Sequence, residues 1–370
     1  MLTTPLESLI KYVNQPSGSH DKADVAAVAQ MFSEDFSSLG FQTELIPGNE
    51  YGPVLKAVIG TGSRQLMLMG HMDTVFPRSV YVPFRDLGNG KALGSGSIDM
   101  KGGDVVMLYA LQKALPQLDL SRVRLCVILN PDEEVGSPES HSVILDTARD
   151  SFAALSFEPC SSDYRLTCAR KGVTSVHIAC EGIPGHSGAQ YKQCASAIQA
   201  LCGHITALYG LRDDERDISF NAGLIRGGTA ENVVAPTAEA DCEFRYFDEQ
   251  LKPGLVERIQ EICAAERVPG VKTTITFGAS HPAIDLNEKS QKLLDLAMEI
   301  SEKQGQKRYH EKTGGAGDIA IAGLAGIGVL DGLGLAGEKM HTTEECVDLS
   351  SLPRQIDFAA EMIVNTFQAV

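Results

Sequence analysis

Short apolar runs alternate with segments of helical spacing along most of the chain. Two such segments, Asp104–Leu115 and Leu352–Phe367, predict helices. Continuous apolar runs that end abruptly at glycine, proline or an acidic residue are typical of parallel strands covered on both faces. The clearest of these runs are Leu66–Met69, Val123–Leu129, Ala153–Phe157 and Ile327–Leu330. Together they predict an α/β fold with one doubly wound, mostly parallel sheet.

The middle of the chain has a different pattern. Its segments predict the order strand, helix, strand, strand, helix, strand, which is the split βαβ arrangement of ferredoxin-like domains. Because the α/β pattern resumes after His281, we predict an inserted α+β domain at residues 171–280 within a larger domain of residues 1–170 and 281–370. The six segments are Ser175–Glu181, Cys194–Tyr209, Ile218–Ile225, Ala238–Tyr246, Leu255–Ala265 and Val271–Phe277.

Charge and cysteine usage narrow the classes of partner. The 370 residues include 32 Lys plus Arg against 48 Asp plus Glu, a net charge of −16 that repels nucleic acid and anionic membranes. Nine cysteines without a C-x-x-C motif argue against a disulfide framework or a thiolate zinc site. Neither a signal peptide nor an apolar span is evident, so we expect a cytoplasmic protein.

Histidine and carboxylate residues follow the predicted strands. His71 and Asp73 follow the first run, Glu133 and Glu134 follow the second in NPDEEVGS, and Glu158 follows the third. Ligands of open α/β sheets bind beyond the carboxyl ends of the strands. We therefore expect these side chains to share one edge of the sheet.

Two further candidates lie in glycine-rich segments, Asp99 in GSGSIDMKGG and His341 in GLAGEKMHTTEE. Each residue alone reads as an ordinary solvated side chain. Together, so many carboxylates at one edge would repel one another unless a cation lay among them. Imidazole and carboxylate without thiolate suit zinc, or cobalt and manganese, and a shared carboxylate indicates two ions about 3.5–4 Å apart.

These motifs, in this order, resemble a family of di-zinc peptidases and deacylases: bacterial glutamate carboxypeptidase, acetylornithine deacetylase, succinyl-diaminopimelate desuccinylase and the aminoacylases. The resemblance covers nearly the whole chain and includes SFEP, GIPGHSG, DCEFRYF and GGAGD. The closing LDGLGLAGEKMHTTEECVDLSSLPRQ is most similar to the glutamate carboxypeptidase branch. The resemblance implies hydrolysis of an amide bond that releases a glutamate-like amino acid with a free carboxylate. N-acyl amino acid deacylation at the same site is the alternative.

The resemblance also implies a metal-ligand set. Asp99 would bridge two zinc ions, and a cis peptide bond would follow it at Asp99–Met100. His71 and Glu158 would complete the site of one ion. Glu134 and His341 would complete the site of the other.

Roles around the metals follow from the same resemblance. Glu133 would be the general base. Asp73 would bind no metal itself but would hold the ring of His71 in place. The resemblance implies that the inserted domain forms a homodimer. His186 of this domain would then act in the active site of the partner subunit. Arg245, with Asn232 nearby, would hold the substrate carboxylate.

Two rivals come from other functional classes. GLGLAG at Gly332–Gly337 satisfies G-x-G-x-x-G after an apolar strand, which would indicate a NAD-dependent oxidoreductase. However, EKMHTTEE follows where an amphipathic helix should begin. An inactive metal-binding scaffold is the other rival, and the intact Glu133 with a complete ligand set argues against it.

Overall fold

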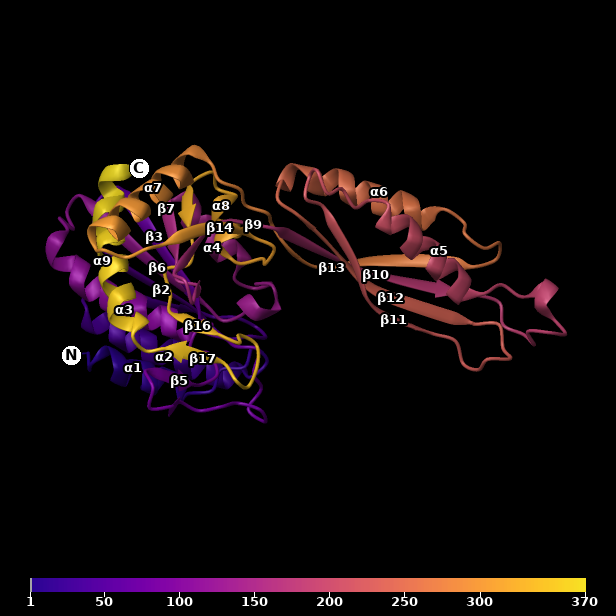
Figure 1. The fold of residues 1–370 in the computed structure, drawn as a ribbon, viewed down its shortest axis with the longest axis horizontal. Helices are drawn as coiled ribbons and strands as arrows, with labels where there is room; N and C mark the ends of the chain where they lie inside the picture. The colour runs from indigo at the N-terminus through magenta and orange to yellow at the C-terminus, as the bar shows by residue number, and fades with distance from the viewer. Residues whose placement is uncertain (1) are drawn as a thin grey trace. The chain divides into compact units, whose positions relative to one another are not determined.

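The computed structural model describes residues 2–370, apart from the side chain of Ala279, and these residues form two compact units. The first unit comprises the chain up to Ala169 together with Leu286–Thr313 and Gly317–Val370. The second comprises Arg170–Asp285 and Gly314–Ala316. The first unit therefore consists of segments from both ends of the chain (Figure 1).

The first unit is built on a six-stranded mixed sheet with the order β1-β2-β6-β3-β7-β15. β6, β3, β7 and β15 are parallel, while β2 is antiparallel to both of its neighbours. Five of the six strands thus share one direction, which confirms the predicted mostly parallel α/β sheet. The strands are β1 Gln42–Ile46, β2 Val54–Ile59, β3 Arg64–His71, β6 Val123–Asn130, β7 Ala153–Ser156 and β15 Gly328–Leu330.

Helices cover this sheet. The two predicted helices are present as α3 (Lys101–Ala114) and α9 (Ser351–Ala369), and α3 is buried over nearly its whole length against α1 and α9. The β3 and β6 strands are buried on both faces, which explains their unbroken apolar runs. The other helices are α1 Pro5–Val13, α2 Lys22–Ser38, α4 His141–Arg149, α7 Glu288–Lys303 and α8 Ile319–Gly323, with 3₁₀ turns η1 Leu115–Gln117 and η2 Glu133–Val135.

Short strands that the sequence pattern did not predict complete the first unit. They form a five-stranded sheet of order β4-β5-β17-β16-β8 and a two-stranded sheet of β14 and β9. In the larger of these sheets, β17 pairs with both β5 and β16. The strands are β4 Arg85–Asp86, β5 Lys91–Leu93, β8 Cys160–Ser161, β9 Arg165–Arg170, β14 Tyr309–Thr313, β16 Ala336–Glu338 and β17 Cys346–Asp348.

The second unit is an antiparallel sheet of order β11-β12-β10-β13 that packs against α5 and α6. Side chains of β10 and β12 alternate between buried and half-buried, as one helix-covered face requires. This arrangement confirms the predicted ferredoxin-like α+β fold. Its elements are β10 Gly172–Glu181, η3 Tyr191–Gln193, α5 Ala197–Tyr209, β11 Ser219–Gly227, β12 Thr237–Tyr246, η4 Glu249–Leu251, α6 Lys252–Ala264 and β13 Lys272–His281.

Candidate active site

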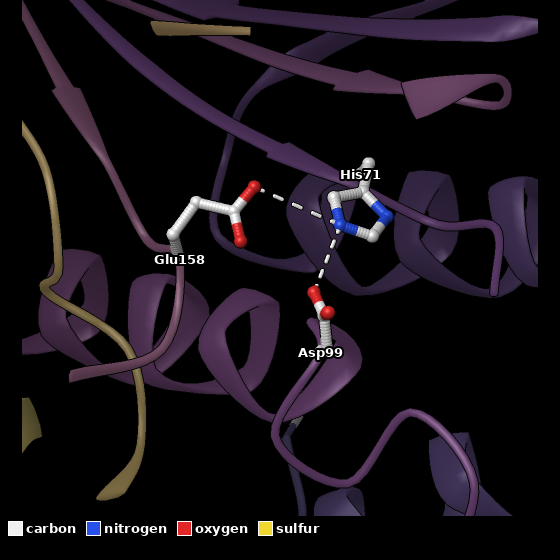
Figure 2. Close-up of side chains that lie close together, drawn as sticks. All are labelled: His71, Asp99 and Glu158. Carbon is white, nitrogen blue, oxygen red and sulfur yellow. Dashed lines mark hydrogen bonds and ion pairs between the residues drawn. The ribbon is translucent and has the colours of Figure 1, made fainter. Parts of the chain in front are cut away.

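His71 is the last residue of β3, and its side chain is only 1% exposed. One ring nitrogen, Nδ1, lies 3.1 Å from the carbonyl oxygen and 3.3 Å from a carboxylate oxygen of Asp73. The other, Nε2, lies 3.2 Å from Asp99 Oδ1 and 3.7 Å from Glu158 Oε1 (Figure 2). The ring is thus held on one side and faces two carboxylates on the other.

Asp99 lies between two histidines. It lies near the end of the loop between β5 and α3, its Oδ1 faces His71, and its Oδ2 lies 3.0 Å from Nε2 of His341. His341, in the loop between β16 and β17, also lies 3.3 Å from Glu134 Oε2. The peptide bond Asp99–Met100 is cis, as the resemblance implied.

Two groups of side chains with metal-ligating atoms therefore share Asp99. Within each group, one ligating atom per residue lies within 4.8 Å of the others. The groups are His71, Asp99, Glu158 and Asp99, Glu134, His341.

Asp73 holds more than the histidine. Its buried carboxylate accepts hydrogen bonds from the backbone N–H of Glu133 and of Glu134, both at 3.2 Å, and from Ser19 Oγ at 2.7 Å. One carboxylate therefore fixes the ring of His71 and the turn that carries both glutamates.

Electrostatics at the site favour a positive charge between the carboxylates. Hydrogen bonds to Asp99 and Glu134 raise the pKa of His341 to about 10. Burial alone would lower the pKa of His71, but its bonds to Asp73 and Asp99 outweigh burial and raise the pKa well above 6.5. A proton on each ring supplies charge that a divalent cation would supply instead.

The donor set fits metal ions. It combines two imidazoles with three carboxylates, and Glu134 Oε1 is buried without a hydrogen-bond partner among residues 2–370. A buried carboxylate oxygen without a partner costs free energy, and a bound metal ion would remove that cost. The residues that the sequence assigned to metal binding are thus brought together in one place.

Asp318 is a further carboxylate near the site, and no role for it follows from the sequence pattern. It is buried, and it accepts hydrogen bonds from Asn130 Nδ2 at 2.7 Å and from Ser137 Oγ at 2.6 Å. Burial raises the pKa of Asp318 to about 7 and raises the pKa of Glu133 well above 4.5, to which the charge of Asp318 contributes. The GGAGD motif, which ends at Asp318, was the available signal.

Arg245 lies near the end of β12 in the second unit and is already engaged. Its Nε and Nη2 donate to the two carboxylate oxygens of Glu243 at 2.9 and 3.0 Å, and its Nη1 donates to Gly314 O at 2.8 Å. A guanidinium has five N–H groups, so two remain for a ligand. The side chain is about one-third exposed and is held in a fixed orientation.

His186 is exposed in a turn of the same unit. Its Nδ1 accepts hydrogen bonds from the backbone N–H of Gly188 at 3.1 Å and of Ala189 at 3.3 Å. A neutral ring that accepts at Nδ1 carries its proton at Nε2. His186 therefore presents a donor to its surroundings.

Asn232 lies with the His186 turn and not with Arg245. Its carbonyl accepts from Ser187 N at 3.0 Å, and it precedes Thr237, the first residue of β12. Eight residues of strand at about 3.4 Å each put roughly 27 Å between Thr237 and Arg245. The structure thus places Asn232 beside Ser187, before β12 begins, and Arg245 near the other end of that strand.

A model of the peptidase family M20/M25/M40 matches residues 67–365, a range that contains both ligand groups. The chain belongs to this family. Carboxypeptidase G2 from Pseudomonas sp. (strain RS-16) is 29% identical to this M20 enzyme over 372 residues, covering 97% of this chain and 88% of that protein. Succinyl-diaminopimelate desuccinylase from Xylella fastidiosa (strain M12) is 27% identical over 367 residues, covering 92% of this chain and 93% of that protein.

Solved structures show the same fold. Aminopeptidase PepT from Bacillus cereus matches with a TM-score of 0.80 at 18% identity, covering 98% of both chains. An M20 metallo-carboxypeptidase from Sulfolobus solfataricus matches with a TM-score of 0.80 at 16% identity, covering 99% of both. The M20 chain is an enzyme that hydrolyses amide bonds, and its fold is that of its family.

The dinucleotide-binding alternative is not supported. Gly332–Gly337 leads into strand β16, whereas the G-x-G-x-x-G fingerprint must open a helix.

Among residues 2–370, no helix is long and apolar enough to cross a membrane.

Proposed function

We propose that this M20 enzyme is a two-zinc carboxypeptidase that releases a glutamate-like amino acid with a free α-carboxylate. One observation carries the proposal: the two oxygens of Asp99 face Nε2 of His71 and Nε2 of His341, at 3.2 and 3.0 Å. A carboxylate placed between two imidazoles could offer one oxygen to each of two metal ions, as two-metal hydrolytic sites use.

The five ligand residues would hold two zinc ions, and cobalt or manganese would suit the same donors. His71 and Glu158 would hold one ion and Glu134 and His341 the other, with Asp99 shared. Bound there, the ions supply the Lewis acidity that activates water and polarises the scissile carbonyl.

Glu133 would move the proton. It precedes the ligand Glu134 in the η2 turn but belongs to neither ligand group, so its carboxylate is left for acid–base chemistry. Burial raises its pKa, which suits a group that takes a proton from water and returns it to the leaving amine.

Arg245 would bind the carboxylate of the substrate. The two N–H groups that Glu243 and Gly314 leave free match one carboxylate, and lysine could not reproduce this paired geometry. We expect Arg245→Lys to raise KM strongly for carboxylate substrates. Amidating the α-carboxylate of the substrate should raise the KM of the wild type about as much as the Arg245→Lys substitution does. The same amidation should raise the KM of the variant little further. Equal wild-type turnover of carboxylate and carboxamide substrates would remove Arg245 from the site.

We also propose a homodimer formed through the second unit, in which His186 and Asn232 serve the site of the partner. Asn232 lies before the start of β12, beside Ser187, and Arg245 lies near the end of that strand, so one site that uses both would draw them from two chains. Edge strand β11, with Leu224 and Ile225 exposed, is available for pairing. Mixing inactive His186→Ala and Glu133→Gln proteins should then restore activity after subunit exchange, and a fully active monomer would refute the dimer.

The test of the function is a hydrolysis screen before and after chelation. Its substrates are C-terminal glutamyl peptides, pteroyl-glutamates and N-acyl amino acids. We expect chelation to abolish turnover and zinc or cobalt to restore it, with glutamyl substrates preferred. A preference for N-acyl amino acids would favour the deacylase alternative, to which the desuccinylase relatives point. Full turnover after exhaustive chelation would refute the metal mechanism.

The nine cysteines are all free thiols in the structure, which is consistent with our proposal of a cytoplasmic, reducing location.

A further inference from the structure

Glu345 lies buried beneath the loop that carries Asp99. Its side chain belongs to neither ligand group, and the residue is only 1% exposed. Its carboxylate accepts hydrogen bonds from four donors on four consecutive residues. These are Gly96 N at 3.0 Å, Ser97 Oγ at 3.4 Å, Ile98 N at 2.8 Å and Asp99 N at 3.3 Å.

The loop needs such an acceptor. Residues 94–99 have no helix or strand of their own, yet all of them are buried, so unpaired N–H groups there would be costly. Converging backbone N–H groups form a concave anion site, and here the anion is a side chain of the same protein. The carbonyl of Glu345 also accepts from Gly94 N at 3.2 Å, which ties the start of the loop to the same residue.

The orientation of Asp99 depends on this loop. Each of its two oxygens must face a different imidazole, so a rotation of the carboxylate that improves one contact would impair the other. Glu345 bonds the backbone N–H of Asp99 itself and that of the residue before it. Glu345 also follows His341 by four residues, so one short segment supplies a ligand and the anchor of the bridging ligand.

We infer that Glu345 is a positioning residue that orients the Asp99 carboxylate to serve both metal ions at once. This inference rests on the proposed two-metal function and adds to it a residue that binds no metal. Because Asp99 is shared, the loss of Glu345 should weaken both ion sites. The loss of His341 should weaken only one.

The test is zinc binding, measured by competition with a fluorescent chelator, to wild type, Glu345→Gln, His341→Ala and Glu344→Gln. Glutamine keeps the shape of Glu345, but its amide nitrogen cannot accept from the loop. We expect Glu345→Gln to weaken both zinc-binding steps by at least about tenfold, as the loss of an orienting group does. It should also change the Co²⁺ absorption spectrum. Glu344 is the matched control, because its side chain is 69% exposed and pairs with Lys339.

Thermal unfolding of the chelated proteins separates positioning from folding. If Glu345→Gln does not fold, Glu345→Asp decides, because it keeps the charge and shortens the reach by one methylene. A folded Glu345 variant that binds two zinc ions with wild-type affinities overturns the inference and leaves the proposed function intact. A wild-type protein that binds no zinc refutes the proposed function, and this inference with it.

Discussion

The two ligand groups that share Asp99 differ in how deeply they lie in the protein. In the inner group, the side chains of His71 and Glu158 are 1% and 11% exposed, and Asp73 holds His71 from behind. In the outer group, His341 is 56% exposed and lies in a loop where its own φ is +60°. The difference lies at His341, because the Glu134 side chain is only 6% exposed: the inner group is enclosed by protein, whereas the outer group reaches solvent through one histidine.

Substituting the two adjacent glutamates of the η2 turn separates acid–base chemistry from metal binding. We expect the largest change in turnover from these substitutions. Glu133→Gln keeps the shape but removes the base, so turnover should fall by at least about 10²–10⁴-fold with unchanged metal content. Glu134→Gln should lower the metal content as well. Elemental analysis beside steady-state kinetics measures both, and equal metal content in the two variants would contradict our assignment.

Alanine substitution of each histidine compares the two groups directly. His341→Ala should keep the inner ion and nearly the wild-type melting temperature, since the ring is half exposed. His71→Ala should lose the inner ion and lower the melting temperature of the chelated protein, because it leaves a buried cavity beside unpaired carboxylates. Equal losses from the two variants would remove the distinction between inner and outer groups.

Asp73 offers a smaller, graded test of the inner group. Asp73→Asn keeps the size of the side chain but removes the charge that orients His71 and receives the N–H groups of Glu133 and Glu134. We expect metal affinity to fall by about 10–100-fold. Ser19→Ala, which removes one neutral donor to the same carboxylate, should cost less. The reverse order would show that Asp73 does not support the ligands.

The pH dependence of stability should differ between chelated and zinc-loaded protein. Folding raises the pKa of His341 from 6.5 to about 10 and that of Asp318 from 3.8 to about 7. Each group therefore binds more protons in the folded state than in the unfolded state. The free energy of unfolding is highest below the unfolded pKa of each group and falls as pH rises from that value to the folded pKa. Zinc requires deprotonated ligands, so it should stabilise more at high pH. The gap in melting temperature between the two forms should widen from pH 6 to 9, and a constant gap would contradict the pKa shifts.

Much of the inner group was predictable from the sequence. His71 and Glu158 come just after the apolar runs Leu66–Met69 and Ala153–Phe157, and parallel strands bring their carboxyl ends to one edge of a sheet. In the outer group, Glu134 likewise follows the long strand β6, but Asp99 and His341 are flanked by β5, β16 and β17, strands of three residues each that are too short to show any periodicity. Glycine-rich segments marked Asp99 and His341 as candidates, but only the resemblance to the family gave each of them a metal.

In the second unit, closeness in sequence does not give closeness in space. Asn232 and Arg245 are close in sequence, but the extended β12 lies between them and separates them. The role of Glu345 is not predictable from sequence, because its partners are mainly backbone N–H groups and no sequence motif records them.

The most direct test of the bridged centre is anomalous diffraction at the zinc edge from crystals of the zinc-loaded enzyme. We expect two peaks about 3.5–4 Å apart, with Asp99 contacting both. The inner peak should contact His71 and Glu158, and the outer peak should contact Glu134 and His341. A single peak, or two peaks that do not share Asp99, would contradict the two-metal mechanism.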